Sequence, residues 1–413
     1  MSRKILAIIG GGASGMAAAA EASDYADNDT EIIIYERLPT VGKKLLATGN
    51  GRCNIMNKNA DIKMYSGDTG QAEAVFKNYT PRDNIEFFEK MGLRFSEEED
   101  GRLYPMSFRA ASVLDALRFE LANRNIRTVT GCKIEKIEKD KEGFILNGSE
   151  KANAVIVAGG GKSAKVQGSD GSCFELLKSL GVKINPTFPS LTGIVIKKKN
   201  KALKGIRAKG EILIVDSGRV KASAKGELQY TDYGISGIPA MNVSRAVSEH
   251  FALHKKGQIL MAVNCMPDFS AEEIFDYIIQ RKKSNPSLKC EDLLSGVMPK
   301  QLGIAKIEKA GINRSAPLSS VTKSSAAALT EILNSDIFEI SGVLGFDHSQ
   351  VTAGGADLSF FDNETLEAKK LPGLFACGEV LNIDGICGGY NLGWAWSSGR
   401  AAGKAAALYL ARR

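Results

Sequence analysis

A run of small residues near the start of the chain has the types and spacing that bind a pyrophosphate. Residues 10–15 read GGGASG. In such a run Gly10 permits a tight turn, Gly12 has no side chain to hold a phosphate away from the backbone, and Gly15 lets a helix pack closely. Glu36 stands where a carboxylate accepts hydrogen bonds from ribose hydroxyls, and its charge disfavours a 2′-phosphate. We therefore predict a dinucleotide site formed by Gly10, Gly12, Ala13, Ser14, Gly15, Glu36 and Arg37.

The segments around this run predict the elements that such a site needs. Residues 5–9 (ILAII) are continuously apolar, as is typical of a parallel strand buried on both faces. Residues 16–22 (MAAAAEA) predict a helix, whose N-terminus offers free N–H groups and a positive dipole to phosphates. Residues 31–35 (EIIIY) predict a second strand, ending beside the acid. This order is the dinucleotide-binding fingerprint and predicts an α/β, Rossmann-like domain.

A loop rich in glycine and positive charge follows at residues 41–54 (VGKKLLATGNGRCN). Its residue types suit contacts with a second, larger part of the same cofactor. They equally suit a surface loop with ordinary turn chemistry. The candidate contacts are Lys43, Lys44, Gly49, Asn50, Gly51, Arg52, Cys53 and Asn54.

The thiols and imidazoles argue against metal or dithiol chemistry. The seven cysteines are scattered without a CxxC pair, which indicates free thiols in a reducing cytoplasm and counts against a dithiol-disulfide flavin reductase. Of the three histidines, His250 and His254 share a helical spacing but have no acidic partner motif, so we place them on a helix surface. We predict no metal site.

Size and charge indicate a multidomain, soluble protein. The 413 residues exceed one compact core, and no stretch approaches the length of a membrane span. The net charge of +7 is spread along the chain, and residues 197–201 (KKKNK) are interpreted as a solvated turn because no aromatic residues accompany them. We expect a cytoplasmic protein with no membrane or nucleic-acid partner. The sequence does not define its oligomeric state.

Several motifs then resemble one family over nearly the whole chain. They lie at residues 42–54, 101–107, 226–237, 351–355 and 378–392. Together they resemble a bacterial flavoprotein family that includes aminoacetone oxidase and bile-acid 4,6-reductase-like proteins. The resemblance implies a glutathione-reductase-like fold with non-covalently bound FAD, so Cys53 is not expected to anchor the flavin covalently.

The resemblance also implies further cofactor contacts. It places the strand at 154–157 and its glycines under the adenosine half, and the backbone near Ile134 against the adenine. It implies that Glu379 accepts hydrogen bonds from the ribityl hydroxyls. It also implies that the N-terminus of the helix that begins near Tyr390 faces the N1–C2=O edge of the flavin. The residues implied are Ile134, Ala158, Gly159, Gly160, Gly378, Glu379, Asp384, Gly389, Tyr390, Asn391 and Leu392. The chain departs from the family at Asn382, where an acid is usual.

The predicted domain order is an FAD-binding domain over residues 1–190, an inserted domain over 191–342, and a return to the first domain over 343–413. The inserted domain is expected to be β-barrel-like, with a helical subdomain at about 268–312. Residues 80–121 predict helices around a turn at 101–107, and residues 133–146 alternate like an antiparallel hairpin. No second GxGxxG follows a strand, so any nicotinamide cofactor would visit without a Rossmann site of its own.

These features favour an FAD-dependent oxidoreductase acting on a small molecule. One hypothesis is NAD(P)H-driven reduction of an activated C=C bond, in a steroid- or bile-acid-like compound for example. A second is an oxidase that passes electrons from a small amine, such as aminoacetone, to O₂. A third is a flavin-binding module without turnover. We favour the first, with Arg52, Tyr104 and Tyr390 as the candidates to orient or protonate a substrate.

Overall fold

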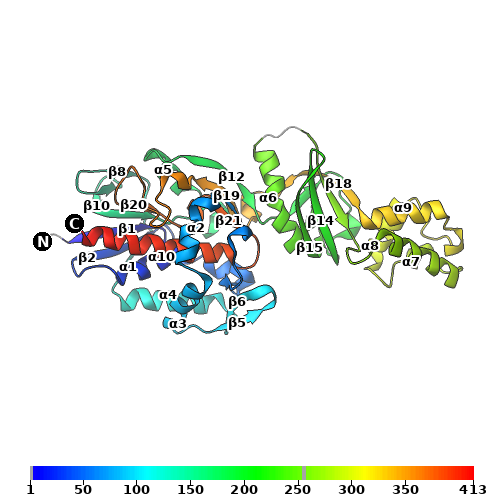
Figure 1. Ribbon diagram of the computed structural model, residues 1–413, viewed down its shortest axis with the longest axis horizontal. Coiled ribbons are helices and arrows are strands. Elements are labelled where there is room, and N and C mark those ends of the chain that lie inside the picture. The colour runs from blue at the N-terminus through cyan, green and yellow to red at the C-terminus, as the bar shows by residue number, and fades with distance from the viewer. Residues whose placement is uncertain (1–2, 254–256) are drawn as a thin grey trace. The chain divides into compact units, whose positions relative to one another are not determined.

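The computed structural model of the chain describes residues 3–253 and 257–413, which form two compact units (Figure 1). Unit 1 combines Met1–Phe188 with Gln350–Arg413, and unit 2 is the segment Pro189–Ser349 between them. Each unit has an apolar core of its own. The chain therefore begins unit 1, completes unit 2, and then returns to finish unit 1.

A parallel five-stranded sheet forms the centre of unit 1, with the strand order β20-β11-β1-β2-β7. Its strands are β1 (Lys4–Ile9), β2 (Thr30–Glu36), β7 (Arg127–Thr130), β11 (Ala154–Val157) and β20 (Leu374–Ala376). The apolar runs of β1 and β11 are buried on both faces, as continuous hydrophobic strands of parallel sheets are. The predicted α/β, Rossmann-like class is confirmed.

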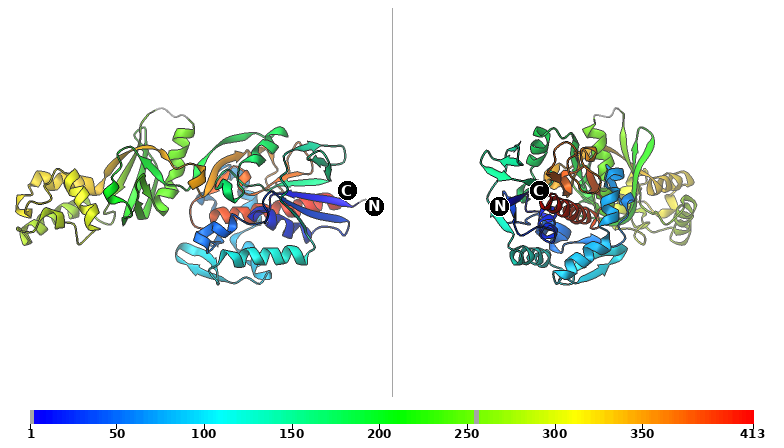
Figure 2. Two further views of the ribbon diagram at one scale, coloured as in Figure 1. Left: turned by 180° about the vertical axis from the view of Figure 1, so that it is seen from behind. Right: turned by 60° about the vertical axis from the view of Figure 1, so that its left-hand side comes forward.

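Two helices rich in small residues pack closely in unit 1. They are α1 (Ala13–Ser23) and α10 (Tyr390–Ala411), and Figure 2 shows α10, in red, running lengthwise through the unit. A Cβ atom added to Gly399 would lie 2.4 Å from the Ser14 carbonyl oxygen, and one added to Gly403 would lie 2.2 Å from that of Ala18. The glycines of α10 therefore let the two helix backbones approach each other.

The segment between β2 and β7 contains a hairpin that the sequence analysis missed. Residues 101–107 were predicted as a turn between helices, and this prediction is wrong for most of the segment. Arg102–Pro105 form β6, which pairs antiparallel with β5 (Phe95–Glu98) and with β3 (Met56–Asn57). These strands are too short to show a clear alternation, and β3 pairs with residues that follow it by 45 to 47 positions in the chain.

The other elements of unit 1 complete the surroundings of the sheet. The helices are α2 (Thr69–Asn78), α3 (Pro81–Lys90), α4 (Ala110–Asn123) and α5 (Ser172–Ser179). The remaining strands are β4 (Tyr65–Gly67), β8 (Ile137–Lys139), β9 (Phe144–Leu146), β10 (Glu150–Ala152), β12 (Ile184–Ser190), β19 (Val351–Ala356) and β21 (Ile383–Gly385). The antiparallel pairing of β8 with β9 confirms the predicted hairpin.

Unit 2 contains a closed barrel with the order β13-β16-β15-β14-β17-β18, which confirms the predicted barrel. Its strands are β13 (Ile194–Ile196), β14 (Arg207–Asp216), β15 (Arg219–Tyr230), β16 (Gly234–Ser236), β17 (Ile259–Asn264) and β18 (Asp336–Val343). Its helices are α6 (Ile238–Ala252), α7 (Ala271–Ser284), α8 (Lys300–Lys309) and α9 (Lys323–Asn334). The helices α7 to α9 lie in the chain between β17 and β18, and α9 extends the helical segment beyond residue 312.

His250 is buried, which corrects the prediction of a helix-surface residue. Its side chain is 5% exposed, and Nδ1 lies 3.1 Å from the Asp216 carboxylate. The helical spacing explains the burial, because His250 follows Val243 and Val247 on the inward face of α6. His254 lies outside the described residues.

Candidate functional site

The turn between β1 and α1 has the shape of a phosphate cradle. Gly10 has a φ of +112°, and a Cβ atom there would lie 2.6 Å from the Ala158 carbonyl oxygen. A Cβ atom on Gly15 would lie 1.9 Å from the Gly10 carbonyl oxygen. Around Gly12, in contrast, an added Cβ atom would have no neighbour within 4 Å. Open space therefore lies at the N-terminus of α1, where Ala13 and Ser14 form the first turn, and an FAD pyrophosphate fits this cradle.

Glu36 is fixed at the end of β2 by two backbone amides. Its Oε2 accepts a hydrogen bond from Gly11 N and its Oε1 accepts one from Leu38 N, both at 2.8 Å. A carboxylate has about four acceptor positions, so Glu36 retains capacity for ribose hydroxyls. The next residue, Arg37, forms an ion pair with Asp170 just before α5.

The side of the cradle that is predicted to face the adenosine is lined by small residues and by buried backbone. Ala158 follows β11, and Gly159 is so tightly packed that a Cβ atom there would lie 2.0 Å from Cys173 Sγ. Gly160 has a φ of +73°, a conformation that favours glycine. Ile134 is buried in the loop before β8, and Cys132 N, two residues earlier, donates to Glu36 O at 2.9 Å. The structure therefore brings this segment next to the end of β2.

Glu379 is held by three parts of unit 1. Lys44 Nζ donates to Oε2 at 2.8 Å, and Thr352 N donates to Oε1 at 2.8 Å. The preceding Gly378 has a φ of +77°, and its N–H donates to Ser398 Oγ on α10. The carboxylate is thus oriented in advance, and it lies beside the glycines that follow β11.

We predict that Lys44 positions this carboxylate for the cofactor. Replacing Lys44 with Met removes the ion pair, and FAD affinity is expected to fall about tenfold, or about 1.4 kcal/mol. Lys43 was also predicted to contact the cofactor, but its side chain is exposed and no ion pair is recorded for it within the described residues, so Lys43→Met removes the same charge and should weaken FAD binding less. Titration of the apoprotein with FAD, followed by flavin fluorescence, measures both. Equal losses for the two variants would contradict a specific role for Lys44.

The loop at residues 49–54 has an unusual backbone, lies just before β3 in the chain, and contacts the residue that precedes α10. Gly49, Asn50, Gly51 and Cys53 all have φ between +55° and +82°. The Asn54 amide, oriented to satisfy its neighbours, donates to Leu103 O and Met56 O and accepts from Gly389 N. This amide therefore ties the loop to the residue that precedes α10.

The three predicted catalytic candidates, Arg52, Tyr104 and Tyr390, occupy this region. The Arg52 guanidinium lies 4.4 Å from the centre of the Tyr104 ring and 4.9 Å from that of Phe108, and it forms an ion pair with Glu98. Tyr390 opens α10, and burial raises the pKa of its phenol, so it stays protonated at neutral pH. Its ring meets Tyr65 edge-on at 5.9 Å.

Cys53 is buried, and its burial raises the pKa of the thiol to about 11. At pH 8 only on the order of one molecule in a thousand would carry the reactive thiolate. We therefore expect iodoacetamide to leave Cys53 unlabelled in the native protein and to label it after denaturation, as peptide mass spectrometry would show. Partly exposed Cys132 is the internal control, and rapid native labelling of Cys53 would contradict its burial.

The residues around the start of α10 are connected by side-chain amides. Asn391 Nδ2 donates to Gly385 O at 2.8 Å and its Oδ1 accepts from Gly385 N at 2.9 Å, which fixes the turn after buried Asp384. Leu392 is half-buried on the same turn of helix. Asn382 donates to Asp68 at 2.9 Å. An acid at position 382 would place a second negative charge against the Asp68 carboxylate. The hydrogen bond to Asp68 therefore gives a local reason for asparagine at this position.

Two residues of this region carried no assignable signal in the sequence. Thr352 stands in a motif, but nothing there indicates that its amide holds Glu379. Glu98 belongs to the acidic run at 97–100, and no pattern selects the one residue that pairs with Arg52. Both contacts join segments far apart in the chain.

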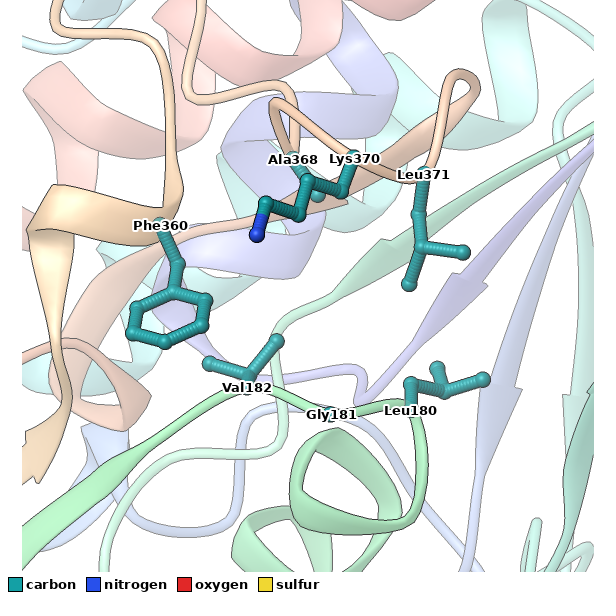
Figure 3. Close-up of a pocket in the computed structure, with 7 residues that line it drawn as sticks. All are labelled: Leu180, Gly181, Val182, Phe360, Ala368, Lys370 and Leu371. Atoms are coloured by element: carbon teal, nitrogen blue, oxygen red, sulfur yellow. The ribbon is translucent and has the colours of Figure 1, made fainter.

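A separate pocket of about 220 Å³ lies elsewhere in unit 1 (Figure 3). It is lined by Leu180, Gly181, Val182, Phe360, Ala368, Lys370 and Leu371. None of the sequence-predicted site residues lines it. Within the described residues, no cluster of three potential metal ligands occurs and no helix has the length and apolarity to cross a bilayer.

The fold and the cradle define a Rossmann-type flavoprotein, a flavin-dependent oxidoreductase. The chain belongs to the family described as the HI0933-like protein Rossmann domain, which matches residues 4–405. The predicted family and enzyme class are therefore confirmed.

Three similar proteins illustrate the relationship. The 3-dehydro-bile acid delta(4,6)-reductase of Clostridium scindens is 36% identical over 97% of this chain and 98% of its own length. The ribosomal RNA dihydrouridine synthase of Escherichia coli is 26% identical over 96% of each chain. Among solved structures, the 3-ketosteroid delta1-dehydrogenase of Sterolibacterium denitrificans is 13% identical, with a TM-score of 0.47 over 98% of this chain and 99% of that one.

Proposed function

We propose that the protein reduces a C=C bond conjugated to a carbonyl group, with FAD as its cofactor and NAD(P)H as the electron source. The observation that carries this proposal is the 36% identity, over 97% of the chain, to a protein named as a reductase of 3-dehydro-bile acids. A small, planar, oxidised steroid-like compound is accordingly the proposed substrate class. The cysteines are scattered along the chain without a CxxC pair, which is typical of a reducing compartment, so we propose a cytoplasmic enzyme.

The chain and the cofactor have separate tasks in this reaction. FAD, when bound, supplies the hydride chemistry. The glycine cradle, Glu36 and Glu379 would hold its pyrophosphate, ribose and ribityl groups respectively. The residues around Arg52 and Tyr390 would orient the substrate and supply a hydrogen bond or proton.

Anaerobic mixing of the purified holoprotein with NADH and then NADPH tests the proposal. Rapid loss of the oxidised flavin band, followed by its return when an enone or an unsaturated 3-oxosteroid is added, is the expected result. Bleaching by a small amine such as aminoacetone, but by neither nicotinamide, would favour the oxidase instead. No bleaching by any donor would favour a flavin-binding module.

A second candidate substrate is a uridine in RNA. A relative with 26% identity is named as a ribosomal RNA dihydrouridine synthase, and the C5=C6 bond of uracil is also conjugated to a carbonyl. Unit 2 favours this candidate through its charge, with 22 Lys and Arg against 16 Asp and Glu in 189–349. No ion pair is recorded for Lys198, Lys199 or Lys201 in the described structure. Polyanions bind such surfaces in a salt-dependent way.

Nucleoside mass spectrometry distinguishes the two substrates. Ribosomal RNA incubated with the holoenzyme and NAD(P)H should gain dihydrouridine if RNA is the substrate. Replacing Lys198, Lys199 and Lys201 with Gln should then reduce the yield and its salt dependence, without changing turnover of a free enone. If the RNA gains no dihydrouridine while the enzyme still reduces an enone, RNA is excluded as the substrate and the small-molecule proposal stands.

A further inference from the structure

The proposed reaction requires a donor at one particular atom of the substrate. A hydride forms a new C–H bond at the β-carbon, the π electrons move toward the carbonyl oxygen, and a proton later adds at the α-carbon. Negative charge therefore develops on that oxygen. A fixed donor aimed at a developing oxyanion is among the largest contributions that a protein makes to a rate.

The cations of the loop at residues 41–54 differ in their availability for this task. Lys44 is occupied by Glu379 at 2.8 Å. Lys43 is exposed and makes no ion pair among those recorded for the described residues. Arg52 is neither buried nor free, because its side chain is 41% exposed while two aromatic rings and one carboxylate hold it.

The contacts of Arg52 leave one end of the guanidinium available. Its Nε atom is shielded from solvent and makes no hydrogen bond with the described residues. Its Nη2 atom donates a hydrogen bond to Glu98. No hydrogen bond of Nη1 is recorded within the described residues. A guanidinium is a rigid fork of five donors, so fixing one edge also fixes the direction of the others.

The backbone on both sides of Arg52 is held in a sparsely populated conformation. Asn50 has a φ of +55° and Cys53 has a φ of +56°. Phe108, whose ring contacts the guanidinium, has a φ of +51°, which is rare for a bulky residue. Such strain is concentrated at ligand-binding positions, where the surrounding structure maintains it. Asparagine adopts this conformation readily, so the strain lies at Cys53 and Phe108. Two strained residues next to a single side chain are a second indication, independent of its charge, that this arrangement serves a ligand.

We propose that Arg52 is the catalytic residue that binds the carbonyl oxygen of the substrate, and that Glu98 is the positioning residue that orients it. The assignment rests on the proposed function for its reaction, but it holds for an enone and for a uracil alike, since both develop charge on a carbonyl oxygen. Tyr104 and Phe108 fix the plane of the guanidinium. Of the three catalytic candidates, the oxyanion role therefore goes to Arg52.

Ligand binding without turnover tests the assignment first. The probe is 4-nitrophenolate, a planar ring that carries an oxyanion, titrated into the oxidised holoprotein and followed by perturbation of the flavin spectrum. We expect Arg52→Met to weaken binding of the phenolate at least tenfold and Arg52→Lys to restore part of it. Arg109→Met is the matched control, because Arg109 is an exposed arginine just beyond Phe108 and should leave binding unchanged. Equal binding by wild type and Arg52→Met would overturn the proposal.

Half-reaction kinetics then test the role in the reaction. With an enone as oxidant, Arg52→Met should slow reoxidation of the reduced enzyme about 100-fold, the usual effect of removing one oxyanion donor. Reduction by NAD(P)H should stay within about twofold of wild type, because no substrate oxyanion forms in that step. Glu98→Gln should slow reoxidation less than Arg52→Met does, with a larger effect on KM than on kcat. Slowing of both half-reactions alike would indicate a merely structural Arg52.

The two proposals fail in different ways. If wild type transfers electrons to no enone and no uridine, the proposed function fails, and the phenolate titration still decides whether Arg52 binds an oxyanion. If wild type reduces an enone and Arg52→Met does so equally well, the function stands and the assignment of Arg52 is wrong.

Discussion

A Gly12→Val variant is expected to fold normally and to lose FAD. Gly12 precedes α1 with a φ of −83° and a ψ of −168°, which any residue adopts, and an added Cβ atom would have no neighbour within 4 Å. The valine methyl groups would instead fill the space that a pyrophosphate needs and cover the free N–H groups of the helix. Losing two charge-assisted hydrogen bonds costs about 3 kcal/mol, so FAD affinity should fall at least about 100-fold. Equilibrium dialysis of the apoprotein against FAD measures the change.

Two further glycine variants separate binding from folding. Gly12→Ala adds a smaller group to the same space and should weaken FAD binding less than Gly12→Val. Gly10→Ala should instead destabilise the fold, because its φ is +112° and its Cβ atom would lie 2.6 Å from the Ala158 carbonyl oxygen. Circular dichroism of all three apoproteins checks the folds. Unchanged FAD affinity in a well-folded Gly12→Val protein would contradict this place for the pyrophosphate.

The first part of the fold could be predicted because its signals are local. Residues 5–36 contain two continuous apolar strands, a glycine turn and an alanine-rich helix, and each follows from a short stretch of sequence. Short β-like runs after residue 191 predicted the barrel, and the apolar run at 374–377, which ends in Gly378 and Glu379, predicted the return to unit 1. Neither argument gives a contact between side chains.

The contacts that organise the site are distant in the chain and were not predictable. Lys44 and Glu379 are 335 residues apart, and each is predicted from the sequence as a cofactor contact, but nothing in the sequence pairs them. Glu98 lies among other acids, so its pairing with Arg52 depends on the β5–β6 hairpin, which has no clear signal in the sequence. His250 was misplaced because the orientation of α6 depends on the barrel against which it packs.

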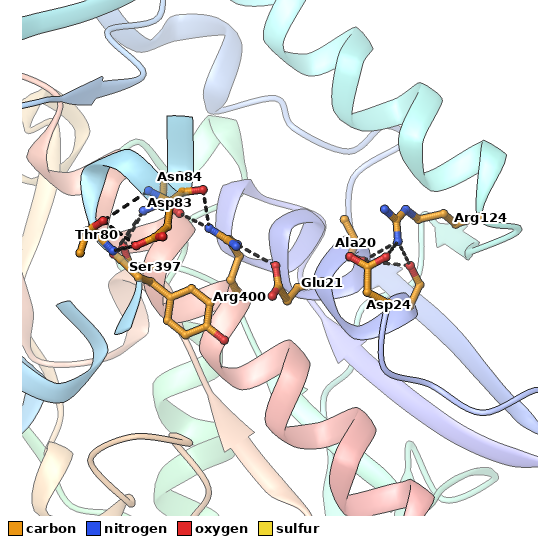
Figure 4. A network of polar contacts seen from close by, with 11 residues as sticks. Ala20, Glu21, Asp24, Thr80, Asp83, Asn84, Arg124, Ser397 and Arg400 are labelled. Carbon is orange, nitrogen blue, oxygen red and sulfur yellow. Dashed lines mark hydrogen bonds and ion pairs between the residues drawn. The ribbon is translucent and has the colours of Figure 1, made fainter. Parts of the chain in front are cut away.

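Breaking the buried ion pair between α1 and α10 should cost more stability than any surface change in unit 1. Arg400 Nε donates to Glu21 Oε2 at 2.7 Å, with side chains 13% and 8% exposed (Figure 4). Arg400 also donates to Asp83 O at 3.0 Å and to Asn84 Oδ1 at 3.1 Å. Arg400→Met leaves the Glu21 carboxylate buried without its cation, so we expect a loss of about 3 kcal/mol in the free energy of unfolding. Urea denaturation of the holoprotein measures it.

The control is Arg124, which follows α4 and pairs with Asp24, three residues beyond Glu21 in the chain. It pairs with Asp24 and Glu120, but the Arg124 and Asp24 side chains are 27% and 51% exposed (Figure 4). Exposed pairs contribute little because water screens them, so Arg124→Met should cost about 1 kcal/mol or less. Adding Glu21→Leu to Arg400→Met should recover much of the lost stability, since the unpaired charge is then removed. If Arg400→Met costs no more than Arg124→Met, the pair stabilises the helix packing no more than a surface contact does.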